Sequence, residues 1–139
     1  MKKLLSFLAP MLFAPLILFA QKPDYRVVFD LTSKDPAVHQ TILRWVSQIT
    51  AETPDAQLEV VFYGGSLDMI RNDRSTFTSE IASLTKNNNV HFVACEMALK
   101  RHNIQKSQLL AGVKTVPDGI YELISKQREG WGYIKVTPQ

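Results

Sequence analysis

Cys95, the single cysteine of the chain, is the residue with the clearest capacity for chemistry. It ends an apolar run at 90–95, and residues 96–102 follow as a predicted helix. A sulfur that opens a helix faces unpaired backbone N–H groups and the positive end of the helix dipole, and both favour thiolate over thiol. A thiolate attacks disulfides or carries a sulfane sulfur as a persulfide. The alternative interpretation is a small, buried and inert apolar side chain.

The three histidines, His39, His91 and His102, supply neither a base nor a metal centre for this cysteine by sequence proximity. His91 shares a strand face with Cys95, but four strand residues separate the two by about 13 Å. His102 lies about two helical turns beyond Cys95. With one cysteine and scattered histidines, the sequence predicts no metal site and no cofactor.

Short apolar runs alternate with helical spacing and predict the elements that position Cys95. Strands are expected near 26–32, 58–63, 90–95, 113–116 and 133–136. Asp35 and Pro36 predict the start of the first helix, and Ser75 or Thr76 is expected to cap the second. One face of the last predicted helix carries Ile120, Leu123, Ile124 and Gln127. The alternation predicts an α/β domain whose mostly parallel sheet of about five strands has helices on both faces.

The carboxyl ends of parallel strands form the edge where ligands collect in such sheets. Three predicted turns fall there, and they carry Cys95 as the candidate sulfur acceptor. The same turns supply a candidate pocket edge, formed by Tyr63, Gly64, Gly65, Glu96, Pro117 and Gly119. Plainer interpretations stay open, because two glycines also make an ordinary turn and an acid in the first turn of a helix complements its dipole.

The first twenty residues have the pattern of a secretory signal peptide. Lys2 and Lys3 form a short positive region, residues 4–19 carry no charge, and Ala20 precedes a polar run. The uncharged run of 16 residues is shorter than the roughly 20 that a spanning helix needs, and Pro10 and Pro15 interrupt it. We therefore expect cleavage near Ala20, a single domain over 21–139, and a periplasmic or secreted protein that is not held in a membrane after cleavage.

The charge balance excludes one class of partner. The chain has 16 basic and 13 acidic residues, and removing Lys2 and Lys3 leaves 14 against 13, a net charge near +1. A domain this close to neutral is not expected to bind nucleic acid or an anionic membrane surface.

A lone cysteine in an exported chain cannot form an internal disulfide, so it is buried, linked to another molecule, or reactive.

Several stretches resemble the DsrE/DsrF-like family of small sulfur-relay proteins. The similar segments lie at 27–30, 60–65, 90–104, 110–119 and 122–130, and together they span essentially the whole chain after the signal. The most specific is Val90-His-Phe-Val-Ala-Cys-Glu-Met-Ala-Leu-Lys-Arg-His-Asn-Ile104, followed by Val-Pro-Asp-Gly at 116–119. The chain is most similar to an exported subgroup that has one cysteine and an aromatic–glycine loop.

The resemblance implies a three-layer α/β/α domain that assembles into homo-oligomers, usually trimers or hexamers. In cytoplasmic members, a cysteine at the position of Cys95 accepts persulfide sulfur from a donor protein and passes it to an acceptor. Relay partners of that kind would be absent outside the inner membrane, so the role does not transfer automatically.

Three hypotheses follow. The first is an exported sulfur carrier or thiol-redox protein that acts through Cys95, which places it nearer to a carrier than to a turnover enzyme. The second is a non-enzymatic oligomer that binds a small ligand or a metal, with a structural cysteine. The third is a purely structural oligomer. Reactivity of the thiol in the native protein separates the first from the other two.

Overall fold

The computed structural model describes residues 24–138 and contains a five-stranded sheet with all neighbouring strands parallel. The strand order is β4-β3-β2-β1-β5. The strands are β1 Arg26–Leu31, β2 Gln57–Phe62, β3 Val90–Cys95, β4 Lys114–Val116 and β5 Gly132–Lys135. The helices are α1 Pro36–Glu52, α2 Thr78–Leu84, α3 Glu96–Arg101 and α4 Gly119–Arg128, with 3-10 turns η1 Gly64–Ile70 and η2 Lys106–Gln108. The predicted α/β fold with a parallel sheet is confirmed.

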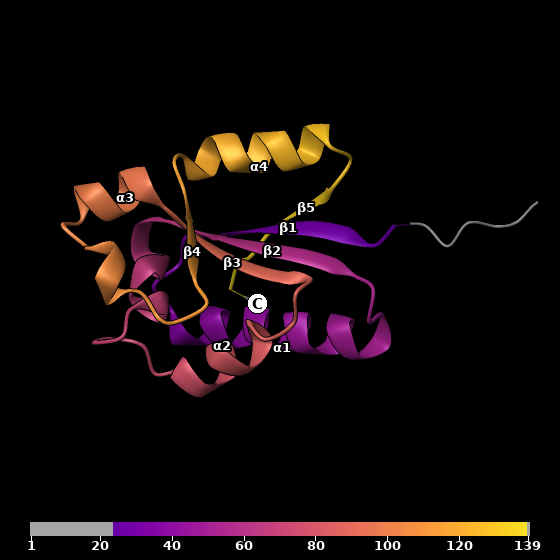
Figure 1. Ribbon diagram of the computed structural model, residues 1–139, viewed down its shortest axis with the longest axis horizontal. Helices are drawn as coiled ribbons and strands as arrows, with labels where there is room; N and C mark the ends of the chain where they lie inside the picture. Colours follow the sequence, from indigo (N-terminus) through magenta and orange to yellow (C-terminus); the bar gives the residue numbers. More distant parts are fainter. Residues whose placement is uncertain (1–23, 139) are drawn as a thin grey trace, which may run out of the picture.

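Helices cover both faces of the sheet, which gives the predicted three layers. In Figure 1, α1 and α2 lie below the strands, α4 runs above them, and α3 lies at the upper left, beyond their carboxyl ends. Most residues of β1, β2 and β3 are buried on both faces because helices cover both sides of the sheet, and Asp30 and Glu59 are buried among them. Cys95, at the end of β3, therefore belongs to the edge where all five strands finish.

The layer formed by α1 and α2 is the main hydrophobic core. Asp35 caps α1 by accepting a hydrogen bond from the Ala37 backbone N–H, and Pro36 occupies the first turn. The buried apolar stripe of α1 is Val38, Ile42, Leu43 and Val46. These side chains pack against the alternate strand residues that face them, such as Phe29, Val60 and Phe92.

The layer formed by α4 is much thinner. Its hydrophobic cluster consists of Val28, Val61, Val93, Leu123 and Trp131. Asp118 caps α4 by accepting hydrogen bonds from the backbone N–H groups of the next turn. Of the four residues predicted to share one face of this helix, only Leu123 is buried, whereas Ile120 and Ile124 are exposed. The helix therefore presents apolar side chains outward as well as inward.

Several predicted boundaries differ from the structure by one or more residues. Ser75 does not cap α2, because its hydroxyl accepts a hydrogen bond from the Phe77 backbone N–H and makes a local turn; α2 begins at Thr78. Strand β5 starts one residue early, because Gly132 pairs with Val27.

The predicted signal peptide at 1–20 lies outside the described residues. Within residues 24–138, none of the helices combines the length and the hydrophobicity that crossing a membrane requires.

Candidate functional site

Cys95 is the last residue of β3 and the residue immediately before α3. It was expected to open the helix and instead precedes it by one position, with an extended backbone and no side-chain capping hydrogen bond. Its side chain is 6% exposed. The thiol thus lies at the predicted edge of the sheet but is covered.

Gly119, the first residue of α4, covers Cys95. A Cβ atom built on Gly119 would lie 3.0 Å from the Cys95 Cβ, 3.6 Å from its sulfur and 3.1 Å from the Val61 Cγ1. Contacts this short are tighter than most Cβ contacts, so a side chain at position 119 would push α4 or the thiol aside, and glycine lets α4 start directly against Cys95. The sequence predicted that these two residues share an edge, and the structure brings them into contact.

Tyr63 is the neighbour of Cys95 on the adjacent strand. Phe62 pairs with Ala94, so Tyr63 and Cys95 follow at the next position of the same register. Burial raises the pKa of Tyr63 strongly, and the Asp30 carboxylate raises it further, with smaller effects of Tyr133 and Cys95. A phenol in this state keeps its proton, and the same carboxylate of Asp30 holds it in a polar network at this edge.

A buried carboxylate, Asp30, organises the polar side of this edge. It accepts a hydrogen bond of 2.7 Å from the Tyr133 hydroxyl and one of 2.9 Å from the Lys135 ammonium. The Lys135 Nζ also donates to the Thr32 hydroxyl at 3.0 Å and lies 5.6 Å from the centre of the Tyr63 ring. The hydrogen bond to Asp30 is the first cause that raises the pKa of Tyr133 to about 12. The network joins β1, β5 and the end of β2.

Sequence reasoning missed Asp30, Tyr133 and Lys135. A signal was present, because an acidic residue inside the apolar run Val27-Val-Phe-Asp-Leu31 must find a partner when buried. The partner could not be named, since Tyr133 and Lys135 are 103 and 105 residues away in sequence.

Gly64 and Gly65 line a hollow that does not include Cys95. Gly64 has φ of +61°, which favours glycine, and a Cβ on Gly65 would lie 3.1 Å from the Thr32 carbonyl oxygen. The hollow beyond them has a volume of about 230 Å³. Its other lining residues are Lys34, Leu67, Asp68, Arg71, His102 and Ile104. These two glycines are therefore required by the turn itself, and their predicted ligand role stays a prediction.

Glu96 and Pro117 line a separate hollow of about 450 Å³, together with residues of α3 and η2. The Glu96 carboxylate accepts hydrogen bonds from the Lys106 ammonium and the Thr115 hydroxyl. The bond to Lys106, followed by the bond to Thr115, lowers the pKa of Glu96. The six predicted pocket residues thus fall into separate places. Gly119 lies against Cys95, whereas the Glu96 carboxylate, although next to Cys95 in the chain, turns to Lys106 and Thr115.

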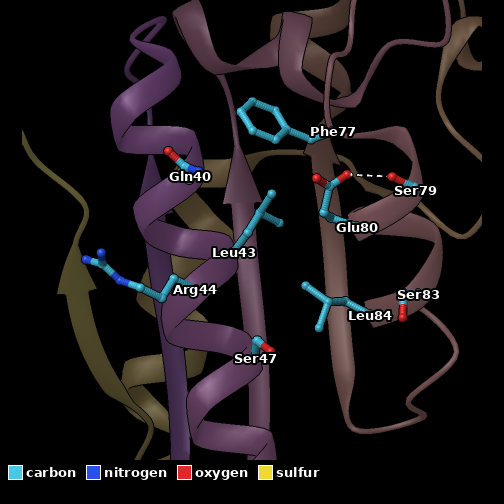
Figure 2. Close-up of a pocket in the computed structure, with 9 residues that line it drawn as sticks. All are labelled: Gln40, Leu43, Arg44, Ser47, Phe77, Ser79, Glu80, Ser83 and Leu84. Atoms are coloured by element: carbon cyan, nitrogen blue, oxygen red, sulfur yellow. Dashed lines mark hydrogen bonds between the residues drawn. The ribbon is translucent and has the colours of Figure 1, made fainter.

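An open groove of about 540 Å³ lies on the opposite side of the sheet, between α1 and α2. Figure 2 shows Leu43, Phe77 and Leu84 directed into it and Glu80 accepting the hydrogen bond from Ser79. Among the described residues that line it there is no cysteine or histidine. The groove is larger than the hollows at the strand ends, but it lies away from the thiol.

Metal chemistry has no visible centre in this part of the chain. Across residues 24–138, no three His, Cys, Asp or Glu side chains gather closely enough to hold a metal ion. The chemically distinctive arrangement that is present combines a covered thiol, a protonated phenol and a buried carboxylate with its lysine.

A parallel α/β sheet with a cysteine at its carboxyl edge, between the starts of two helices, defines a class of small three-layer proteins. The sequence model of the DsrE/DsrF-like family matches residues 26–136, and the chain belongs to this family. The resemblance found in the sequence is thereby confirmed. None of the curated proteins matches the chain.

Solved structures share this fold. A protein of unknown function from Methanobacterium thermoautotrophicum, MTH1491, is 31% identical, with a TM-score of 0.76 over 81% of this chain and 99% of that one. A conserved protein of unknown function from Bacteroides thetaiotaomicron, BT1422, is 14% identical, with a TM-score of 0.67 over 81% and 95% of the two chains. The YchN protein of E. coli is 12% identical, with a TM-score of 0.64 over 81% and 98%. The last two show the fold alone.

Proposed function

We propose that this protein is an exported carrier of sulfane sulfur that uses Cys95 as its acceptor. The observation that carries the proposal is the position of the cysteine, at the carboxyl edge of the sheet, beside a phenol that keeps its proton. Membership in the DsrE/DsrF-like family supports the same chemistry.

The transfer step needs no external oxidant or reductant. The Cys95 thiolate attacks the outer sulfur of a persulfide R–S–SH, the S–S bond of the donor breaks, and R–S⁻ leaves. The product is Cys95–S–SH, and the reverse reaction with an acceptor thiolate unloads it. Lys135, whose ammonium lies 5.6 Å from the centre of the Tyr63 ring, places a positive charge at this edge of the sheet, which favours the thiolate form of the attacking sulfur.

Export is part of the proposal and rests on residues 1–20. Their positive start and uncharged run favour a signal peptide that is removed near Ala20. The intact mass of the protein from its native host should then match a chain that starts near Gln21. A full-length chain recovered from the membrane fraction would contradict this part of the proposal without touching the thiol chemistry.

Assembly into a homo-oligomer is also proposed, with a second copy of the chain covering α4. The outer side of this helix exposes Ile120, Tyr121 and Ile124, and an exposed apolar stripe of this kind is typical of an interface. Light scattering should give at least a trimer, and Ile124→Glu should reduce the mass toward that of a monomer without loss of helix content. A monomer of the native protein at micromolar concentration would contradict the assembly.

The decisive experiment measures sulfur loading. The mature protein, incubated with glutathione persulfide, should gain about 32 Da, one sulfur, and lose it again on reduction. The Cys95→Ser variant should gain nothing, while its circular dichroism spectrum stays unchanged. A native protein that gains no mass and is alkylated only after denaturation would refute the proposal and leave Cys95 as a packing residue.

The rival function is a binding module with an inert cysteine. The burial of Cys95 under Gly119 favours it, and the hollows beside Gly64 and Glu96 would then be the places to look for a ligand. Failure of sulfur loading, together with normal assembly, is the result that would favour this function.

A further inference from the structure

An ion pair lies buried between α4 and the sheet, at the end of the helix opposite Cys95. The Lys126 ammonium is 3.0 Å from one carboxylate oxygen of Glu59 and 3.5 Å from the Glu122 carboxylate. It also lies 4.5 Å from the centre of the Trp131 ring. Glu59 is 4% exposed and sits in the middle of the sheet, on β2.

The residues of α4 that face the sheet recur at helical spacing. Gly119, Leu123 and Lys126 stand at positions i, i+4 and i+7, which place them on one face over about two turns. Gly119 rests on Cys95, Leu123 rests on the valines of the sheet, and Lys126 rests on Glu59. One apolar side chain, one glycine and one ion pair therefore make up the sheet-facing row of this helix.

We propose that Glu59 and Lys126 are positioning residues for Cys95. Their ion pair holds α4 against the sheet, and this contact, the seating of α4, sets how readily a reactant reaches the sulfur. The proposal deepens the proposed function, because it supplies the step that exposes a covered thiol. Cys95 is only 6% exposed and Gly119 lies against it, so movement of the first turn of α4 away from the sheet would open an approach to the sulfur.

The contact between α4 and the sheet is weak enough to open. The apolar cluster under α4 has five buried members, far fewer than the core under α1. The ion pair is incompletely satisfied, because the second carboxylate oxygen of Glu59 is buried without a hydrogen-bond partner among the described residues. Unpartnered buried groups weaken a contact by the cost of removing them from water. A helix held in this way is expected to open locally at lower free energy than the whole fold.

The experiment measures access to Cys95 with iodoacetamide in the native mature protein. In Lys126→Met the stem of the side chain remains but the ion pair is lost, and we expect the alkylation rate of Cys95 to rise about tenfold. Glu59→Gln removes the charge and keeps an acceptor for Lys126, so a smaller rise of about threefold is expected. The matched control is Tyr121→Phe, on the exposed side of α4, which leaves the ion pair intact and should alkylate like the native protein.

Hydrogen exchange separates local seating from general loss of stability. In Lys126→Met and in Glu59→Gln, the amides of α4 should exchange faster while those of α1 keep their native rates. Faster alkylation that coincides with equally faster exchange in α1 would mean global unfolding and would overturn the proposal. An alkylation rate equal to that of the native protein in both variants would overturn it as well.

The outcome does not depend on sulfur transfer. Alkylation reports access to the thiol whether or not Cys95 accepts persulfide sulfur. If the native protein fails to load sulfur but the two variants alkylate faster, the proposed function fails and the seating of α4 stands. If sulfur loads normally and neither variant changes access, the seating fails alone.

Discussion

The two faces of the sheet are built differently. Under α1 the strands meet an unbroken apolar stripe that includes Ile42 and Val46, and the aromatic residues of β1, β2 and β3 complete the core. Under α4 the same strands present Asp30 and Glu59 beside a short row of valines. One strand, β2, contributes Val60 to the first face and Glu59 to the second.

The contrast separates stability from chemistry. Apolar packing gives the α1 face most of the area removed from water, which is the main favourable term in folding. The α4 face carries the buried carboxylates of Asp30 and Glu59, each of which costs free energy unless it is paired, and its first residue lies against Cys95. A thick core on one side allows the other side to hold groups that a small domain could not otherwise tolerate.

The largest effect should come from the core under α1. Ile42 is fully buried, and Ile42→Ala should lower the free energy of unfolding by about 2–5 kcal/mol through lost burial and a cavity. Leu123→Ala, the matched change on the α4 face, should cost about 1–2 kcal/mol because the thin layer can relax around it. Urea unfolding of the mature protein measures both. Equal losses would contradict the difference between the two faces.

The second effect concerns pH. Burial raises the pKa of Glu59 from 4.5 to about 7, and Lys126 only partly opposes this. Because the folded state binds this proton more tightly than the unfolded chain, the contribution is complete below pH 4.5 and is lost as the pH rises to 7. Stability should fall by about 2 kcal/mol over this window, a value that allows for screening at the partly hydrated site.

The control for this window is Glu59→Gln, which cannot titrate. The difference in unfolding free energy between the native protein and Glu59→Gln, measured in urea at pH 4.5 and pH 8, isolates the one carboxyl from all others. A difference that does not change with pH would show that Glu59 has an ordinary acidity. A difference that changes with the opposite sign would mean that the Lys126 partner dominates over burial.

The smallest effect concerns the polar network at the strand ends. Tyr133→Phe removes one hydrogen bond to Asp30 but leaves the bond from Lys135, so the cost should be about 1 kcal/mol. Tyr121→Phe on the exposed side of α4 is the matched control and should change stability by less than about 0.5 kcal/mol. Thermal unfolding of the two variants, followed side by side, measures the difference. Equal midpoints would mean that the hydroxyl of Tyr133 is not used.

The sequence alone predicts the sheet and the edge that holds Cys95, because local apolar runs and helical spacing are short-range signals. It also predicts that Tyr63 and Gly119 share this edge. It does not predict that Gly119 lies on the thiol, since the seating of α4 depends on packing between distant segments. Nor does it predict the partners of Asp30 and Glu59. A buried acidic side chain must be paired, but the sequence does not show which residue pairs with it. The signal peptide stays a prediction.

The pairing of Asp30 with the end of the chain has a consequence for folding. Asp30 lies 103 residues before Tyr133, so its partner arrives last in whatever compartment the chain folds. Until then β1 has neither β5 as a neighbour nor a native donor for its carboxylate. The edge that holds the thiol is therefore finished only when the last residues arrive, and a chain that stops short of them exposes an unpaired acid and an open strand. Completion of the chain and completion of the site are one event.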